Sequence, residues 1–108
     1  MSRRDAAAIL RSAGLPVVYH QWPDGSTPQF PCVRYADEGR HDFLADGANY
    51  FKRQRWSATL VSERKDDDSE GALESALEAA GVVYQKGETV YVSSERLFQV
   101  EYSFTLPD

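Results

Sequence analysis

Two histidines and one cysteine are the side chains of this 108-residue chain that most readily suggest chemistry. His20 and His41 stand far apart in the sequence, and neither has a second histidine four residues away with which to share a metal on one helix face. Cys32 would need a neighbouring base and a positive environment to act as a nucleophile. It lies instead in an apolar stretch, which predicts a buried and inert thiol. We therefore expect no catalytic residue, no metal ligand and no cofactor.

The acidic run Asp66–Asp68 is a further candidate, for a cation. It lacks the alternating ligands, the central glycine and the closing glutamate of an EF-hand loop. Carboxylates are favourable at the positive N-terminal end of a helix, so the run predicts a helix start instead. The sequence also lacks the phosphate-binding patterns GxxxxGK[ST] and GxGxxG and the nucleophile pattern GxSxG.

Basic residues stand among aromatic ones in the middle of the chain, a mixture that can bind single-stranded nucleic acid. Strand alternation places Trp56 in the core, however, where it cannot stack on a base. The chain has 12 basic and 17 acidic residues and a net charge of −5, so we expect no specific nucleic-acid binding. The basic side chains then form either a solvated strand face or ion pairs with a neighbouring subunit. The cluster consists of Lys52, Arg53 and Arg55 with Tyr50, Phe51 and Trp56.

A polar segment with an apolar pair inside it, Glu38–Asn49, is predicted to form an extended hairpin arm. Phe43 and Leu44 stand there in polar surroundings, so they either fold back onto the domain or contact a partner's surface. With Arg40 nearby, the candidate interface comprises Arg40, Phe43, Leu44, Lys52, Arg53 and Arg55.

The elements that position these residues follow from periodicity and turn chemistry. One helix is predicted over 5–13, capped by Asp5, and a second over 69–80, and Gly14 and Gly81 supply their left-handed ends. Helical spacing places Ala6, Ile9, Leu10 and Ala13 on one face, and Leu73, Ala76, Leu77 and Ala80 on another. Strands are predicted over 16–19, 32–36, 50–63 and 98–106, with a loop over 22–31 and a small hairpin of 82–85 and 89–92 around Lys86–Glu88.

Alternation in the strands predicts one apolar and one polar face of the sheet. Trp56, Ala58 and Leu60 should point inward, with Arg55, Ser57 and Thr59 outward, and the closing strand should bury Phe98, Val100, Tyr102, Phe104 and Leu106. The expected fold is α+β, a mainly antiparallel sheet with two helices packed on one face, in a single domain over 1–108. We expect no membrane span and no signal peptide, because no apolar run is long enough and the first residues are charged.

Three pieces of the C-terminal half resemble small tail components of siphophages and prophages, from the head–tail joining region of their genomes. They are Arg55–Asp66, Leu73–Tyr84 and Tyr91–Phe104, the last with a Glu-basic-Leu-aromatic-Gln-Val-x-Tyr-x-aromatic sequence. The run Phe43–Asp46 followed by Tyr50 is similar to the arm before that family's central strand. The first 40 residues match only in their pattern of elements.

This resemblance implies a tail-completion protein with a tail-terminator-like fold and no enzymatic activity. Such a protein would cap the tail tube or join the tail to the head connector, as a ring that is often six-fold. Its partners would be copies of itself, the tail-tube protein and the head-completion or connector protein. It would occur in the host cytoplasm during assembly and then in the virion tail.

Two other classes stay open on the sequence. The small size and α+β order also suit a cytoplasmic regulatory or toxin–antitoxin-type binding module, and Cys32 would be the residue to test in a small enzyme. Neighbouring tail-tube and tape-measure genes would favour the tail component. Loss of an activity on changing Cys32 to Ser would favour the enzyme.

Overall fold

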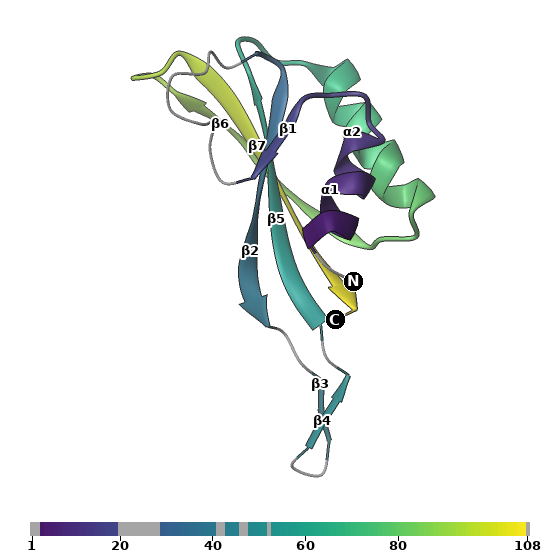
Figure 1. Ribbon diagram of the computed structural model, residues 1–108. Coiled ribbons are helices and arrows are strands. Elements are labelled where there is room, and N and C mark those ends of the chain that lie inside the picture. The colour runs from purple at the N-terminus through teal and green to yellow at the C-terminus, as the bar shows by residue number, and fades with distance from the viewer. Residues whose placement is uncertain (1–2, 20–28, 41–42, 46–47, 52, 108) are drawn as a thin grey trace.

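The computed structural model describes residues 3–19, 29–40, 43–45, 48–51 and 53–107. These residues form two helices and seven strands (Figure 1). In chain order they are α1 (Arg3–Arg11), β1 (Val17–Tyr19), β2 (Cys32–Arg40), β3 (Phe43–Ala45), β4 (Ala48–Phe51), β5 (Arg53–Ser62), α2 (Asp67–Ala79), β6 (Tyr84–Val92) and β7 (Leu97–Pro107).

Five of the strands form one sheet in the order β1-β2-β5-β7-β6, and β3 and β4 form a separate two-stranded sheet. The short β1 runs parallel to β2, and the other neighbours in the main sheet are antiparallel. Both helices lie on the same side of the main sheet (Figure 1). The predicted α+β class, with a mainly antiparallel sheet and two helices on one face, is therefore confirmed.

The core lies between the two helices and the sheet face that they cover. Trp56, Ala58 and Leu60 of β5 are buried as predicted, and so are Leu73 and Leu77 of α2. The β7 positions Val100, Tyr102, Phe104 and Leu106 are buried on the same face. Phe98 is only half-buried, and its ring packs against that of Tyr91 on the edge strand β6, with ring centroids 4.9 Å apart.

Helix α1 places Ala6, Ala7 and Leu10 in the core. It begins at Arg3, so Asp5 lies in its first turn and is not the predicted cap. Gly14 takes the left-handed conformation, with φ of 82°, and its N–H donates to the carbonyl of Arg11 at 3.0 Å. This glycine ends the helix as predicted.

Helix α2 begins at Asp67, inside the acidic run and two residues before the predicted position 69. The Asp66 carboxylate is the N-cap and accepts a hydrogen bond from the backbone N–H of Ser69 at 3.0 Å. Gly81 has φ of 74° and follows the last turn, as predicted. Ala80 is exposed, contrary to the helical pattern, because the helix ends before it at Ala79 and the residue lies at the cap.

Strand β6 contradicts the prediction of a small hairpin around Lys86–Glu88. The whole segment Tyr84–Val92 is one strand that pairs with β7, and an extra residue is taken up by a register shift between Lys86 and Thr89. Gly87 permits the close passage there, since a Cβ on it would lie 3.2 Å from the carbonyl oxygen of Glu101. Pairing along a long neighbouring strand therefore overrides the local turn signal.

The third predicted strand, 50–63, is two strands in the structure. Tyr50 and Phe51 belong to β4, and β5 begins at Arg53. Ser57 alternates with the core residues Trp56 and Ala58 and so lies on the outward face, as predicted. It is nevertheless buried, and its hydroxyl donates to Oε1 of Glu38 on β2 at 2.7 Å. Arg55 is exposed, as predicted.

Candidate assembly interface

The predicted interface residues fall at one end of the molecule, where β2 and β5 meet the two-stranded sheet. Arg40 is the last residue of β2, and Arg53 and Arg55 lie in the first part of β5. Phe43 and Leu44 are the first two residues of β3. Lys52 lies outside the described residues. The structure therefore brings the five described positions to a shared region, on strands β2, β3 and β5.

The predicted arm is a β-hairpin that extends beyond the end of β2 and β5 (Figure 1). Phe43 pairs with Phe51, Leu44 with Asn49, and Ala45 with Ala48, with a register shift after Phe43. The arm differs from the predicted Glu38–Asn49 at both ends, since residues 38–40 belong to β2 of the main sheet and the hairpin reaches Phe51. We call the segment Phe43–Phe51 the arm.

The arm continues two strands that belong to the main sheet. Strand β2 pairs with β5 up to Arg40 and Gln54, and a register shift separates that pair from the one formed by Asp37 and Trp56. The Gln54 side chain adds a hydrogen bond to the carbonyl of Gly39 at 2.8 Å. The base of the arm is thus fixed by strand pairing and by this side-chain contact.

Arg55 lies on the sheet face opposite to the helices, at a shallow hollow of about 270 Å³. Its strand neighbour in β7 is Thr105. The hollow combines a guanidinium with hydroxyl groups and an apolar rim, which suits a polar protein contact. The residues around it are Arg55, Val83, Tyr84, Gln85, Ser103, Phe104 and Thr105.

Cys32 is buried, with 1% of its surface exposed. It opens β2 and pairs with Val61 of β5. Its strand partner Val61 is apolar and supplies neither the base nor the positive charge that a thiolate nucleophile needs. The burial of this thiol agrees with the prediction from its apolar stretch.

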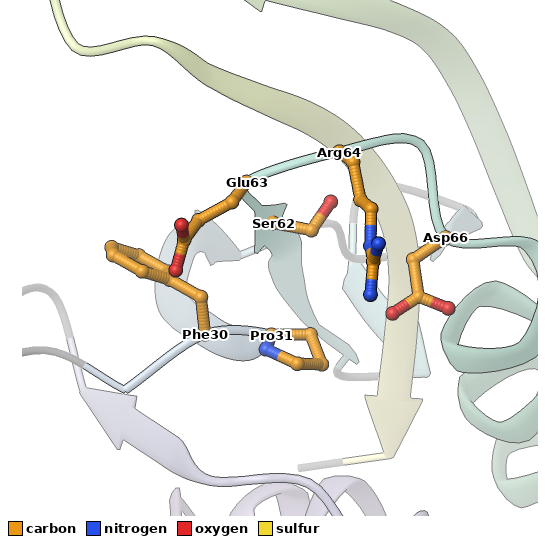
Figure 2. Close-up of a pocket in the computed structure, with 6 residues that line it drawn as sticks. All are labelled: Phe30, Pro31, Ser62, Glu63, Arg64 and Asp66. Atoms are coloured by element: carbon orange, nitrogen blue, oxygen red, sulfur yellow. The ribbon is translucent and has the colours of Figure 1, made fainter.

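A second hollow, of about 390 Å³, lies between the start of β2 and the turn that leads into α2 (Figure 2). The guanidinium of Arg64 points toward the carboxylate of Asp66 in this view, and the ring of Phe30 lies beside Glu63. Hydrogen bonds from the backbone N–H and the hydroxyl of Ser69 lower the pKa of Asp66, and the nearby charge of Arg64 lowers it further. Asp66 is thus a helix cap held in its ionised form.

The sequence reasoning missed a polar network that joins α2 to β6 and β7. Lys86 of β6 places its Nζ 2.8 Å from Oε1 of Glu70 and 3.0 Å from Oε2 of Glu74. Lys65 pairs with the other oxygen of Glu70. The Tyr102 hydroxyl donates to Oε2 of Glu74 at 2.8 Å.

Tyr84 extends this network along the helix. Its hydroxyl donates to Oε2 of Glu78 at 3.0 Å, and its ring packs edge-on against that of Tyr102, with centroids 5.8 Å apart. Glu70, Glu74 and Glu78 stand four residues apart on one helix, so they share a face. That spacing is the sequence signal from which the network could have been found.

The network holds its groups in their ordinary protonation states. Burial raises the pKa of Tyr84 to about 12, and the hydrogen bond to Glu78 acts in the same direction. Hydrogen bonds to Glu70 and Glu74 raise the pKa of Lys86. A general base near neutral pH needs a lysine or tyrosine pKa that is lowered. The pKa values of Tyr84 and Lys86 are raised instead, so the network serves to fix α2 on the sheet.

In the part of the chain that the structure describes, no group of three or more histidine, cysteine, aspartate or glutamate side chains is placed to hold a metal ion. His20 and His41 lie outside the described residues. No helix among the described residues is both long and apolar enough to cross a membrane.

Comparison with known proteins gives no assignment: no protein-family model matches this chain, and no curated protein matches it significantly.

Proposed function

We propose that this chain is a non-enzymatic structural protein of a long-tailed bacteriophage or prophage virion, with a tail-terminator-like fold. It caps the tail tube or joins the tail to the head connector, and it does so as a ring of copies of itself. Its other partners are the tail-tube protein and the head-completion or connector protein. It works in the host cytoplasm during assembly and stays in the virion tail.

The observation that carries the proposal is the arm. Strands β3 and β4 pair with each other in a sheet of their own, beyond the end of the five-stranded sheet. A two-stranded hairpin by itself is at best marginally stable in water. A protein that extends such a hairpin gains stability when a neighbour packs against it. Assembly with other subunits supplies that neighbour.

A ring also needs two different surfaces on each subunit, because its interface is heterologous. The arm supplies one of them, and the sheet faces and edges of the main domain supply the other. The exposed Arg55 and its hollow lie on β5, the strand that follows the arm. A charged side chain at the rim of such a contact fixes orientation more than it adds affinity.

The charge of the chain suits a ring through which DNA passes. With a net charge of −5, the protein does not carry the basic excess that binds phosphates tightly. DNA can therefore move through a lumen formed by such subunits without being held there.

The experiment uses the protein with the tail-tube protein encoded nearest to it in the same genome. Tubes assembled alone and tubes assembled with the chain are compared by negative-stain electron microscopy. We expect a ring at one end of each tube, and tubes that stop growing at that end. Tubes that stay bare while the chain sediments separately would contradict the proposal, as would a gene neighbourhood without tail genes.

A further inference from the structure

Among the described residues, no strand pairs with the outer side of β6, so one long edge of the main sheet is open there. It is the last strand in the sheet order and has nine residues, of which Gln85–Tyr91 are all exposed. A row of unpaired backbone N–H and C=O groups along such an edge can pair with another strand. We call the outer side of residues 83–92 the β6 edge.

The exposed apolar side chains of the described residues gather at this edge. Val83 is 88% exposed, Val90 is 54% exposed and Tyr91 is 52% exposed, and they are the large hydrophobic residues most exposed to water among the described part of the chain. The stretch Thr89–Val92 contains no charged side chain and no proline, the residues with which proteins commonly protect an edge. The β6 edge thus offers both hydrogen bonds and apolar contacts.

The register shift in β6 decides which side chains share a face. Tyr84 and Lys86 point to the helix side, where they meet Glu74 and Glu78 of α2. Thr89 and Tyr91 stand opposite Val100 and Phe98 of β7, so they are on that side as well. Gln85 and Val90 stand opposite Ser103 and Gln99 and are on the other side.

The opposite edge of the sheet does not match this one. Strand β1 has three residues, all half-buried, and it runs parallel to β2. Strand β6 has nine residues and exposed apolar side chains, so β6 of a second copy is its best match. Two copies related by a two-fold axis through the sheet would pair antiparallel, which is the geometry of a closed symmetric dimer.

We propose that two copies of this chain join through their β6 edges into one continuous ten-stranded sheet. One register keeps the faces of both copies consistent along the whole strand. It places Tyr84 opposite Tyr91 of the second copy on the helix side, and Gln85 opposite Val90 on the other side. Lys86 then stands opposite Thr89, and Val83 stands opposite Val92.

This register also suits the chemistry of the side chains. Two tyrosines meet at each end of the helix-side face, and two valines meet at each end of the other face, so Val83 and Tyr91 lose exposed apolar surface. Glu88 falls opposite Gly87, and no two like charges stand directly opposite each other. The register shift between Lys86 and Thr89 of one copy lies beside that of the second copy, at the two-fold axis.

The inference does not rest on the proposed function. A ring contact through the arm joins two different surfaces, whereas the β6 contact joins a surface to itself. Val83, Tyr84 and Gln85 also line the Arg55 hollow, so the β6 contact would cover that hollow in part and leave the arm free.

Sedimentation equilibrium of the full chain tests the dimer. We expect a mass that rises with concentration to twice that of the monomer. Val90→Lys places a charge at the edge and should weaken dimerisation at least tenfold, with the melting temperature unchanged. Ser75→Lys, which adds the same charge at an exposed position of α2, should leave dimerisation as it is. A chain that stays monomeric at all soluble concentrations would overturn the proposal. Equal dimerisation of Val90→Lys and Ser75→Lys would overturn it as well.

Cysteine cross-linking tests the register independently of affinity. Val83→Cys with Val92→Cys places two thiols opposite each other in the dimer, and mild oxidation should give a covalent dimer. Val83→Cys with Gln85→Cys places its thiols at opposite ends of the shared strand pair, and it should not cross-link. Equal cross-linking of both variants would contradict the register. Because Phe43→Ala with Leu44→Ala leaves the β6 edge intact, dimerisation of that variant separates this contact from the arm.

Discussion

Lys86 on β6 reaches Glu70 on α2, with its Nζ 2.8 Å from Oε1, although the two residues belong to different layers of the fold. The Glu70 side chain is 5% exposed, whereas that of Lys86 is 38% exposed. The pair therefore ties a buried carboxylate to the edge of the sheet. The edge strand and the helix are stabilised together.

Replacing Lys86 by Met should destabilise the domain by about 1–3 kcal/mol, because Glu70 and Glu74 lose a charged hydrogen-bond donor. The expected destabilisation is no larger because Lys86 is partly exposed to water and Lys65 still pairs with Glu70. Urea denaturation at neutral pH measures the change. Glu95→Gln, at an exposed position outside the network, is the control and should change stability little. A Lys86→Met variant as stable as the control would show that the network does not fasten α2.

The same network predicts how stability depends on pH in acid. Burial alone would raise the pKa of Glu70, but the hydrogen bonds from Lys65 and Lys86 outweigh it and lower the pKa below 4.5. A carboxyl whose pKa is lower in the folded state stabilises that state above its unfolded pKa, and the stabilisation is lost as the pH falls through the folded pKa. The unfolding free energy should therefore fall below about pH 4.5. In Lys86→Met the unfolding free energy should fall less steeply with pH, so the stability curves of the variant and the parent should converge in acid. Parallel curves would show that Lys86 does not lower the pKa of Glu70.

Leu77→Ala tests the predicted packing of α2. Leu77 is fully buried, so its truncation removes apolar contacts and leaves a cavity. The expected loss is roughly 2–5 kcal/mol of unfolding free energy. Ser75→Ala, on the exposed side of the same helix, should change stability by less than about 0.5 kcal/mol. A loss below about 0.5 kcal/mol for Leu77→Ala would mean that the helix face is wrongly assigned.

Phe43→Ala with Leu44→Ala tests the arm. Burying both side chains against a partner would contribute roughly 3–5 kcal/mol before ordering costs are subtracted. We expect the double variant to melt nearly as the parent does and to fail in tail completion, measured by complementing a phage that lacks the gene. Virions with normal tails would show that the arm is not an assembly contact. Unfolding of the domain would show that the pair belongs to its core.

The acidic charge predicts the response to DNA. At physiological salt we expect no appreciable binding to random duplex, measured by electrophoretic retardation. Retardation at micromolar protein that weakens steeply with added salt would contradict the lumen argument. A salt-independent shift would point to another mode of binding.

Local signals predicted the helices, the closing strand and the arm. Gly14 and Gly81 end helices, and Asp66 begins one, because each acts through its own backbone or its nearest neighbours. Alternation likewise identified Trp56, Leu60 and Tyr102 as buried. Signals of this kind do not depend on which strand lies beside which.

The features that depend on neighbours in space were missed. The turn signal at Lys86–Glu88 is a local preference, and pairing with β7 along the whole of β6 outweighs it. The burial of Ser57 could not be predicted, because it depends on Glu38, which lies beside it on β2. Of the candidate interface, the sequence predicted the arm and the exposed Arg55, but not the open β6 edge, which exists only because β6 is a single strand.

Strand β5 has two roles, since it lies between β2 and β7 in the sheet and also carries the arm. Ten successive residue pairs, from Arg53 with Pro107 to Ser62 with Phe98, join it to β7. A pull on the arm along the strand direction therefore acts as shear on this ladder. Shear loads all the hydrogen bonds of a ladder together, whereas peeling would break them one at a time. The ten pairs with β7 would therefore resist such a pull together.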